Sequence, residues 1–143
     1  MPAVRTRTQQ KRRLKVFVAD DNPDAIVMLA ALLRDEGYVV ETCADARRAL
    51  DAIRRCNPDA CILDIKMPGK SGYELAREIR AAELSPEPLL IAVSGHYKKP
   101  SEQLVARAAG FDHFVPKGTA EPADLLAILE ELALRGDGSP SAA

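Results

Sequence analysis

The sequence predicts an α/β fold in which a parallel sheet is covered by helices on both faces. Short apolar runs alternate with amphipathic stretches of helical period, and this β–α alternation repeats five times. Turn-forming residues separate the runs. The 143 residues suffice for about one domain, and 47% of them are hydrophobic, which is enough to build a core.

The first half of the chain is predicted to hold three strands and two helices. The run KVFVA at 15–19 is long enough for a buried strand. Asn22 is suited to cap the next helix and Pro23 to take its first position, while Gly37 ends it. There follow a strand over 38–44, a helix that Asp45 caps and that runs through Arg55, and a strand over 60–64.

The second half is predicted to hold three helices and two strands. Ser71 is expected to cap the third helix, which the proline-rich stretch 85–88 breaks. Residues 89–94 are apolar throughout and predict a fourth strand. There follow a short helix that Pro100 opens and Gly110 ends, a short strand within 111–116, and a last helix from Glu121.

The two ends differ from the rest in composition. The first 15 residues carry six basic side chains and no acid, although the whole chain has a net charge of −1. Such an arm can bind nucleic acid or an anionic membrane surface, but no aromatic residue lies among its charges. We therefore expect residues 1–13 to be a basic, disordered leader or linker, and residues 136–143 a disordered tail.

Cysteine usage and hydropathy favour a cytoplasmic protein. The chain has neither a signal peptide nor an apolar run long enough to span a membrane. Its three cysteines, Cys43, Cys56 and Cys61, are odd in number and lack metal-site spacing. We expect free thiols that serve packing.

Polar residues follow four of the predicted strands. Asp20 and Asp21 come after the first strand, Asp64 ends the third and Ser94 ends the fourth. Lys117 follows the fifth. Because the carboxyl ends of parallel strands share one edge, and ligands bind there, these side chains should converge on one pocket.

The residue types in this pocket indicate phosphoryl chemistry. Three neighbouring carboxylates repel one another and need a cation, and oxygen ligands without His or Cys favour Mg²⁺ over zinc. A lysine and a hydroxyl suit an incoming phosphoryl group. A carboxylate can attack phosphorus, which predicts Asp64 as the nucleophile. Pro68-Gly69 would fold the following loop so that a backbone carbonyl also faces the metal.

These motifs resemble the receiver domain of two-component response regulators, of the single-domain chemotaxis-like type. The resemblance is carried by Asp20-Asp21 after KVFVA, DIKMPGKSGYELA at 64–76, VSGH at 93–96 and GFDHFVPKG at 110–118. It implies a doubly wound, flavodoxin-like (βα)₅ sheet of order 2-1-3-4-5. The receiver domain would occupy residues 14–135.

The resemblance also implies a role for each site residue. Asp64 would accept phosphate from a histidine kinase or phosphotransfer protein. Asp21 would bind Mg²⁺ directly and Asp20 through water, with the backbone carbonyl of Lys66 as a further ligand. Ser94 and Lys117 would contact the phosphoryl group. Phe114 occupies the position of the aromatic switch residue.

The resemblance further implies how the signal would leave the domain. A downstream protein would bind the face formed by the fourth helix, fifth strand and fifth helix, and a homodimer is a further arrangement that the resemblance allows. We expect no DNA-binding domain, because few residues follow the last helix. The protein would act as a signalling switch rather than as a turnover enzyme.

One departure from the family pattern leaves alternatives open. Gly118, rather than proline, follows Lys117, and Pro116 precedes it. A pseudo-receiver that binds partners without phosphorylation is one alternative, and a receiver segment of a hybrid histidine kinase is another. An aspartyl phosphatase would need a second acid where Lys66 stands. A dinucleotide-binding enzyme would need a glycine-rich loop where the chain has DDNPDA.

Overall fold

The structure, a computed structural model, describes residues 12–95, 100–117 and 121–135. Its strands form one parallel sheet in the order β2-β1-β3-β4-β5, which confirms the predicted doubly wound fold. The strands are β1 (Lys15–Ala19), β2 (Val39–Cys43), β3 (Ala60–Asp64), β4 (Leu89–Ser94) and β5 (His113–Pro116). The helices are α2 (Pro23–Asp35), α3 (Ala46–Cys56), α4 (Gly72–Ala81), α5 (Pro100–Ala109) and α6 (Glu121–Leu134).

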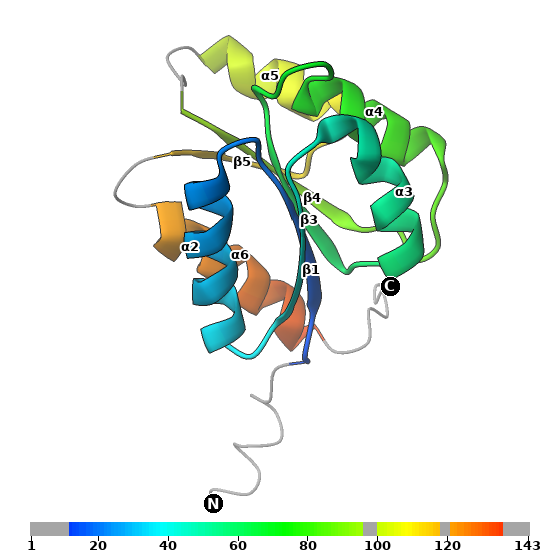
Figure 1. Cartoon of the computed structure of the whole chain (residues 1–143). Helices are drawn as coiled ribbons and strands as arrows, with labels where there is room; N and C mark the ends of the chain where they lie inside the picture. The colour runs from blue at the N-terminus through cyan, green and yellow to red at the C-terminus, as the bar shows by residue number, and fades with distance from the viewer. Residues whose placement is uncertain (1–11, 96–99, 118–120, 136–143) are drawn as a thin grey trace, which may run out of the picture.

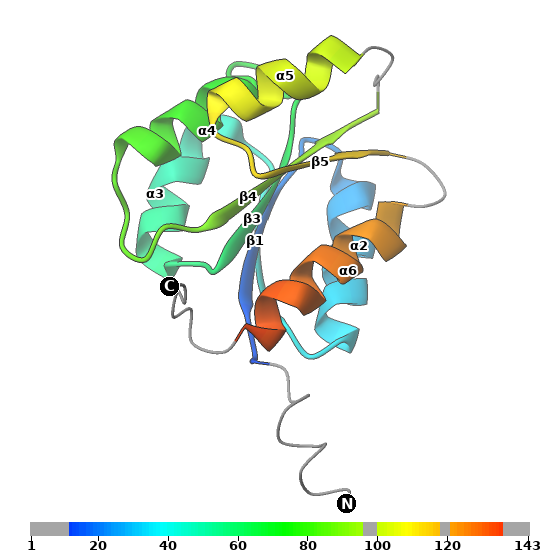
Figure 2. The same ribbon diagram turned by 180° about the vertical axis from the view of Figure 1, so that it is seen from behind.

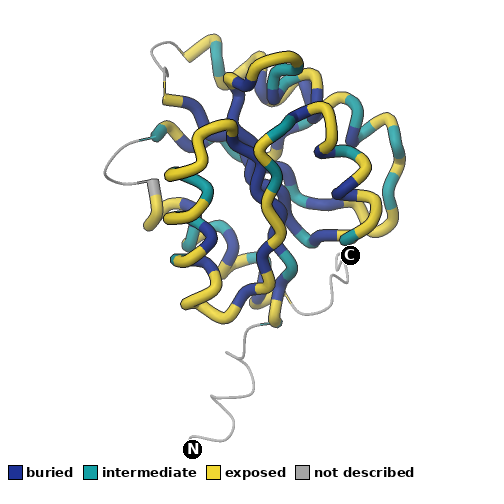
Figure 3. The backbone as a smooth tube through the Cα atoms, viewed as in Figure 1, coloured by how far each residue is buried: buried dark blue, intermediate teal, exposed yellow. Residues whose placement is uncertain are grey.

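The helices cover the two faces of the sheet unequally. Helices α2 and α6 pack on one face, and α3, α4 and α5 pack on the other (Figures 1 and 2). Alternate side chains of β1 serve the two cores: Val16 and Val18 face α2 and α6, while Phe17 and Ala19 face the other three helices. The central strands are buried between these layers (Figure 3), so the packed sheet supports the residues that follow its strands.

The predicted helix caps at Asn22, Asp45 and Ser71 are confirmed. The Asn22 side chain accepts a hydrogen bond from the Asp24 N–H at 3.0 Å, and Asp45 accepts one from the Arg47 N–H at 2.9 Å. Ser71 and Glu74 form a reciprocal capping box. Each cap therefore fixes where a helix leaves the loop that follows a strand.

The predicted bounds of two elements differ from the structure. Strand β2 begins at Val39, because the Tyr38 N–H donates to the Leu33 carbonyl at the end of α2. Helix α3 continues to Cys56 and closes at a left-handed Asn57. Strand β5, His113–Pro116, lies within the predicted stretch 111–116 and starts after Phe111, whose N–H donates to the Ala106 carbonyl at the end of α5.

The first and last described residues lie at the same end of the sheet. The Arg12 N–H donates to the Ala133 carbonyl of α6 at 3.1 Å, and Arg12 Nη1 lies 3.5 Å from Asp59 Oδ1. Arg12, which the sequence assigned to the leader, thus contacts the folded domain. Residues 1–11 and 136–143 lie outside the described residues, so the predicted leader and tail stay predictions.

Two arginine side chains bind backbone carbonyls and thereby join separate elements. Arg34 of α2 donates to the Val40 carbonyl at 3.0 Å. Arg80 of α4 donates to the carbonyls of Gly110 at 3.0 Å and Pro88 at 2.8 Å, and to Asp112 Oδ2 at 2.9 Å. These bonds link α4 to the entry of β4 and to the α5–β5 turn.

Two sequence predictions concern the cysteines and the absence of a membrane-spanning segment. All three cysteines are free thiols, as predicted, and Cys61 is fully buried in the core. Burial raises the pKa of the Cys61 thiol well above its usual value. Among the helices that the structure describes, none has the length and apolar character needed to cross a membrane.

Candidate functional site

The buried polar side chains gather where the parallel strands end. Among the described residues, the buried polar or charged ones are Asp20, Asp64 and Ser94. Asp20 directly follows β1, Asp64 ends β3 and Ser94 ends β4. Burying a carboxylate is costly unless charges or hydrogen bonds compensate, so this concentration at one edge marks a built site.

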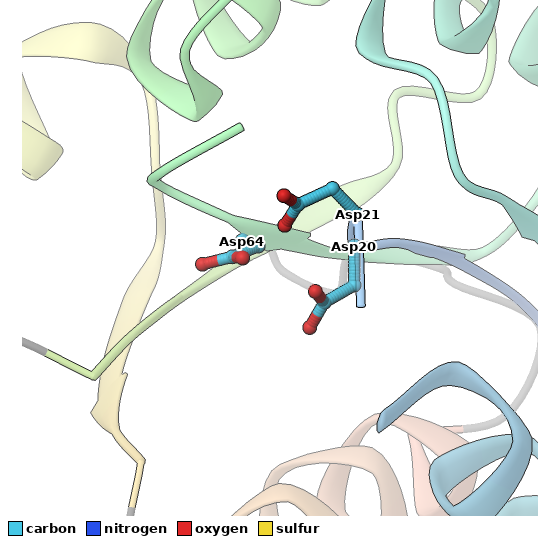
Figure 4. A group of neighbouring side chains, drawn as sticks. All are labelled: Asp20, Asp21 and Asp64. Atoms are coloured by element: carbon cyan, nitrogen blue, oxygen red, sulfur yellow. The ribbon is translucent and has the colours of Figure 1, made fainter. Parts of the chain in front are cut away.

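The predicted acidic cluster is present in the structure. One carboxylate oxygen from each of Asp20, Asp21 and Asp64 lies within 4.8 Å of the other two. Figure 4 shows the three carboxylates directed into the same space beside the ends of β1 and β3. Asp21 is exposed, so solvent has access to the cluster.

These donors fit a hard divalent cation. All three are carboxylate oxygens, the ligand type that Mg²⁺ prefers, and the described residues contribute no His or Cys to the cluster. Oxygens that bind one Mg²⁺ at about 2.1 Å lie no more than about 4.2 Å apart, so the cluster needs at most a small closure.

Local hydrogen bonds orient the first acid. The Asn22 N–H donates to Asp20 Oδ1 at 2.9 Å, while the Asn22 side chain caps α2. The turn that starts α2 thus holds the Asp20 carboxylate beside the cluster. The sequence suggested Asn22 only as a cap, and this second contact was not predicted.

Lys117 supplies the positive charge of the site. Its Nζ lies 3.1 Å from Asp20 Oδ2 and 3.7 Å from Asp64 Oδ2. Its backbone N–H donates to the Ser94 carbonyl at 2.9 Å. Ser94 pairs in register with Pro116, which has no N–H, so the next residue makes this bond instead. The predicted convergence of Asp20, Asp64, Ser94 and Lys117 at one edge is therefore observed.

Burial and like charge perturb the acid at the end of β3. Desolvation, and then the neighbouring Asp20 carboxylate, raise the pKa of Asp64 from 3.8 to about 6. The Lys117 charge and the Lys66 N–H, which lies 3.4 Å from Asp64 Oδ1, oppose this rise. Desolvation and the Asp20 charge thus penalise the ionised form of Asp64, and a bound cation would offset that penalty.

The loop after Asp64 folds tightly against the end of β3. The Ile65 N–H donates to the Val93 carbonyl, and the Gly72 N–H donates to the Ile65 carbonyl at 2.8 Å. A Cβ on Gly72 would lie 2.5 Å from the Asp64 carbonyl oxygen, so only glycine fits there. Gly69 has a φ of 85°, which turns the chain as the Pro68-Gly69 motif predicted.

Sequence reasoning did not single out Gly72, although a signal was available. Glycine at the first position of a helix, directly after a good cap, gains nothing for helix formation. Its presence there indicates close contact with another backbone.

Three further predicted features concern Phe114, Lys66 and Gly118. Phe114 is partly buried and packs against the core that α3, α4 and α5 cover, and its switch role stays a prediction. Lys66 is exposed, and the role of its carbonyl as a metal ligand also stays a prediction. Gly118, the departure from the family pattern, lies outside the described residues.

Comparison with known proteins identifies a family. Residues 16–130 match the response regulator receiver domain. The DNA-binding response regulator MtrA of Mycolicibacterium smegmatis is 30% identical over 129 residues, which cover 90% of this chain and 54% of that protein. This chain therefore spans about half the length of MtrA. An uncharacterized 14.6 kDa protein of Leptolyngbya boryana is 29% identical, and the match covers 88% of this chain and 95% of that protein.

Solved structures show the same fold. The chemotaxis protein CheY4 of Vibrio cholerae superposes with a TM-score of 0.75 and 28% identity, over 82% of this chain and 97% of that one. The receiver domain of the sensor histidine kinase PA1611 of Pseudomonas aeruginosa has a TM-score of 0.74 and 28% identity, over 86% and 98%. That structure has a magnesium ion coordinated in its active site cleft.

Proposed function

Because this chain belongs to the response regulator receiver family of two-component systems, we propose that Asp64 accepts a phosphoryl group from a histidine kinase or phosphotransfer protein in an Mg²⁺-dependent reaction. One observation carries the proposal. The buried carboxylate of Asp64 lies at the shared strand edge, beside two further acids and the ammonium group of Lys117. Receiver domains are normally signalling modules rather than turnover enzymes, and the proposed role is of that kind.

The acids would hold the cation. Asp21, which is exposed, would bind Mg²⁺ directly, Asp20 through water, and Asp64 through one carboxylate oxygen, with the Lys66 carbonyl as a further ligand. When bound, Mg²⁺ supplies positive charge that neutralises the acids and the phosphoryl oxygens. The oxygen-only donor set supports this assignment, and so does the magnesium in the cleft of the PA1611 receiver.

The transfer itself follows from the position of Asp64. Its ionised carboxylate oxygen attacks the phosphorus of a phosphohistidine, a P–O bond forms and the P–N bond breaks, and the electron pair returns to the imidazole of the donor. The product is an acyl phosphate on Asp64. Lys117, which now lies 3.1 Å from Asp20, would turn its ammonium group to a phosphoryl oxygen. The Ser94 hydroxyl would donate a hydrogen bond to another.

The phosphorylated state would then change partner binding. Ser94 and Phe114 lie on neighbouring strands, β4 and β5, so a response of Ser94 to the phosphoryl group can reach the aromatic ring. We place the downstream partner on the face of α5, β5 and α6. The exposed Leu104 and Val105 of α5, with exposed fractions of 70% and 44%, support this placement. The same face would serve a homodimer.

Intact mass spectrometry tests the proposal directly. The protein is incubated with Mg²⁺ and acetyl phosphate, beside Asp64→Ala and Asp51→Ala variants. Asp51 is a matched control because it is an exposed aspartate on α3 that does not belong to the acidic cluster. We expect one phosphate-sized gain in the native protein and the Asp51 variant, dependent on Mg²⁺, and none in Asp64→Ala.

The contrary result would also be informative. If the folded native protein gains no phosphate and does not bind beryllofluoride, a stable phosphoryl mimic, the phosphoacceptor proposal fails. A pseudo-receiver that binds partners without phosphorylation would then be the better account. If the protein gains phosphate from the purified kinase core of a hybrid histidine kinase but from no stand-alone histidine kinase, the result would instead favour a receiver segment of a hybrid kinase.

A further inference from the structure

A second pocket lies at the opposite end of the sheet from Asp64. It has a volume of about 590 Å³ and lies between the residues that precede β1 and the turn from α2 to β2. These two segments meet at the end of the sheet where the strands begin, beside the dark-blue start of β1 in Figure 1. The volume falls within the range typical of small-molecule sites, about 300–1,000 Å³.

Positive charge dominates the lining of this pocket. Arg12 and Arg13 contribute from the segment before β1, and Arg34 contributes from the last turn of α2. The opposing charge in the lining is one carboxylate, that of Glu36. The lining therefore holds three arginines and one acid, and Arg12 is also paired with Asp59 outside the pocket, so the net charge of the lining favours an anion.

Two of these arginines have donors left over. Arg34 spends one N–H on the Val40 carbonyl, and the structure records no other hydrogen bond from its side chain within the described residues. Arg12 reaches Asp59 with Nη1 at the long distance of 3.5 Å. Its Nε atom is buried and has no hydrogen-bond partner in the described part of the chain. A buried donor without a partner is rare in folded proteins, and a modest shift of the Arg12 side chain would be needed to bring this N–H to the pocket.

The remaining wall of the pocket is largely apolar. Tyr38 and Val40 are buried, and Val39 keeps 39% of its surface exposed although it is a large hydrophobic residue. A ligand that covers Val39 would therefore gain apolar contact as well as charge. The glycine turn at Gly37, with a φ of 95°, leaves this side of the pocket open.

We propose that this arginine pocket, lined by Arg12, Arg13, Arg34, Tyr38, Val39 and Val40, binds a small organic phosphate of about nucleotide size. Guanidinium groups match phosphate oxygens in charge and in the geometry of their paired donors. The apolar wall would accept the base or another flat part of the ligand.

The pocket is independent of the phosphoacceptor chemistry. Five residues of β1 separate the two ends of the sheet, which is roughly 15 Å at the usual rise per residue. No residue of the pocket belongs to the acidic cluster or to the pair Ser94 and Lys117. The proposal can therefore be tested while the phosphoacceptor site is blocked.

Titration of the full chain, followed by backbone amide NMR, tests the proposal. The phosphoacceptor site is first saturated with Mg²⁺ and beryllofluoride, and ADP, pyrophosphate and inorganic phosphate are then added separately. We expect saturable shifts of the Gly37, Val39 and Val40 amides with ADP, and tighter binding of ADP than of inorganic phosphate. Arg12→Gln and Arg13→Gln should each weaken ADP binding roughly tenfold.

Arg77→Gln is the matched control, because Arg77 is an exposed arginine of α4 on the other face of the sheet. It should leave ADP binding unchanged. Equal affinity for ADP and inorganic phosphate would overturn the nucleotide-sized ligand and leave an oxyanion site. No saturable shift at millimolar ADP, or shifts that the Arg12 and Arg13 variants do not weaken, would overturn the proposal as a whole.

Discussion

Replacing Asp64 by asparagine should stabilise the metal-free protein at neutral pH. The pKa of Asp64 is raised from 3.8 in a free side chain to about 6 in the folded state. Below pH 3.8 the carboxyl is protonated in both states and adds no penalty. Between pH 3.8 and about 6 the carboxyl is ionised in the unfolded state but still protonated in the folded state, so the free energy of unfolding falls by 1.36 kcal/mol per pH unit, about 3 kcal/mol in all. Above pH 6 this loss is complete.

Asparagine has nearly the same shape but no charge to desolvate. The Asp64→Asn variant should therefore gain up to about 3 kcal/mol, or roughly 10 °C in melting temperature, above pH 6.5. The gain should vanish as the pH falls toward 4. Melting in EDTA from pH 4.5 to 8, with the exposed Asp51→Asn as a control, measures this difference.

Two results would refute this reasoning. One is an Asp64→Asn variant that is less stable than the native protein at pH 7.5 without metal. The other is a stability difference that does not change between pH 4.5 and 7.5, because a titrating carboxyl must produce a pH-dependent term. Added Mg²⁺ should reverse the order at neutral pH, since the native cluster binds it more tightly than the variant does.

Three further outcomes follow from the geometry. Lys117→Met should tighten Mg²⁺ binding severalfold in calorimetry, because the ammonium group of Lys117 competes with the cation for the same acids. The same variant should slow phosphorylation by acetyl phosphate. Weaker Mg²⁺ binding by the variant would contradict this reasoning. Gly72→Ala should lower the free energy of urea unfolding by about 3 kcal/mol, because its Cβ would overlap the Asp64 carbonyl, and an unchanged midpoint would exclude the close contact. Arg80→Ala should lower the free energy of unfolding by about 3 kcal/mol, because three hydrogen bonds are lost, whereas exposed Arg77→Ala should lower it by less than about 0.5 kcal/mol. Equal effects of the two variants would show that the Arg80 hydrogen bonds do not stabilise the fold.

The sheet and the convergence of the site were predictable from the sequence for one reason. Each strand is a short apolar run whose end is marked by a polar residue, and parallel strands bring such ends together. Asp20, Asp64 and Ser94 therefore met at one edge as expected. Helix caps were equally predictable, because capping depends on residues within one turn.

What could not be predicted depends on contacts between distant segments. Arg80 has the pattern of a solvated helix charge, yet it binds carbonyls that lie 8 and 30 residues away in the chain. The pocket around Arg12 forms only because the segment before β1 meets the end of α2. Sequence periodicity describes one helix or strand at a time, so a contact between distant segments cannot be predicted from it.

The bond from Arg34 to the Val40 carbonyl also bears on self-association. Strand β2 is an edge of the sheet, and its Val39 N–H points inward to the Leu14 carbonyl. The next residue, Val40, therefore turns its carbonyl outward, where it could pair with a strand of another molecule. The Arg34 guanidinium occupies that carbonyl and places a charge on the edge. Charge on an edge strand opposes pairing with a strand of another molecule, so we expect Arg34→Ala to raise the tendency of the protein to aggregate.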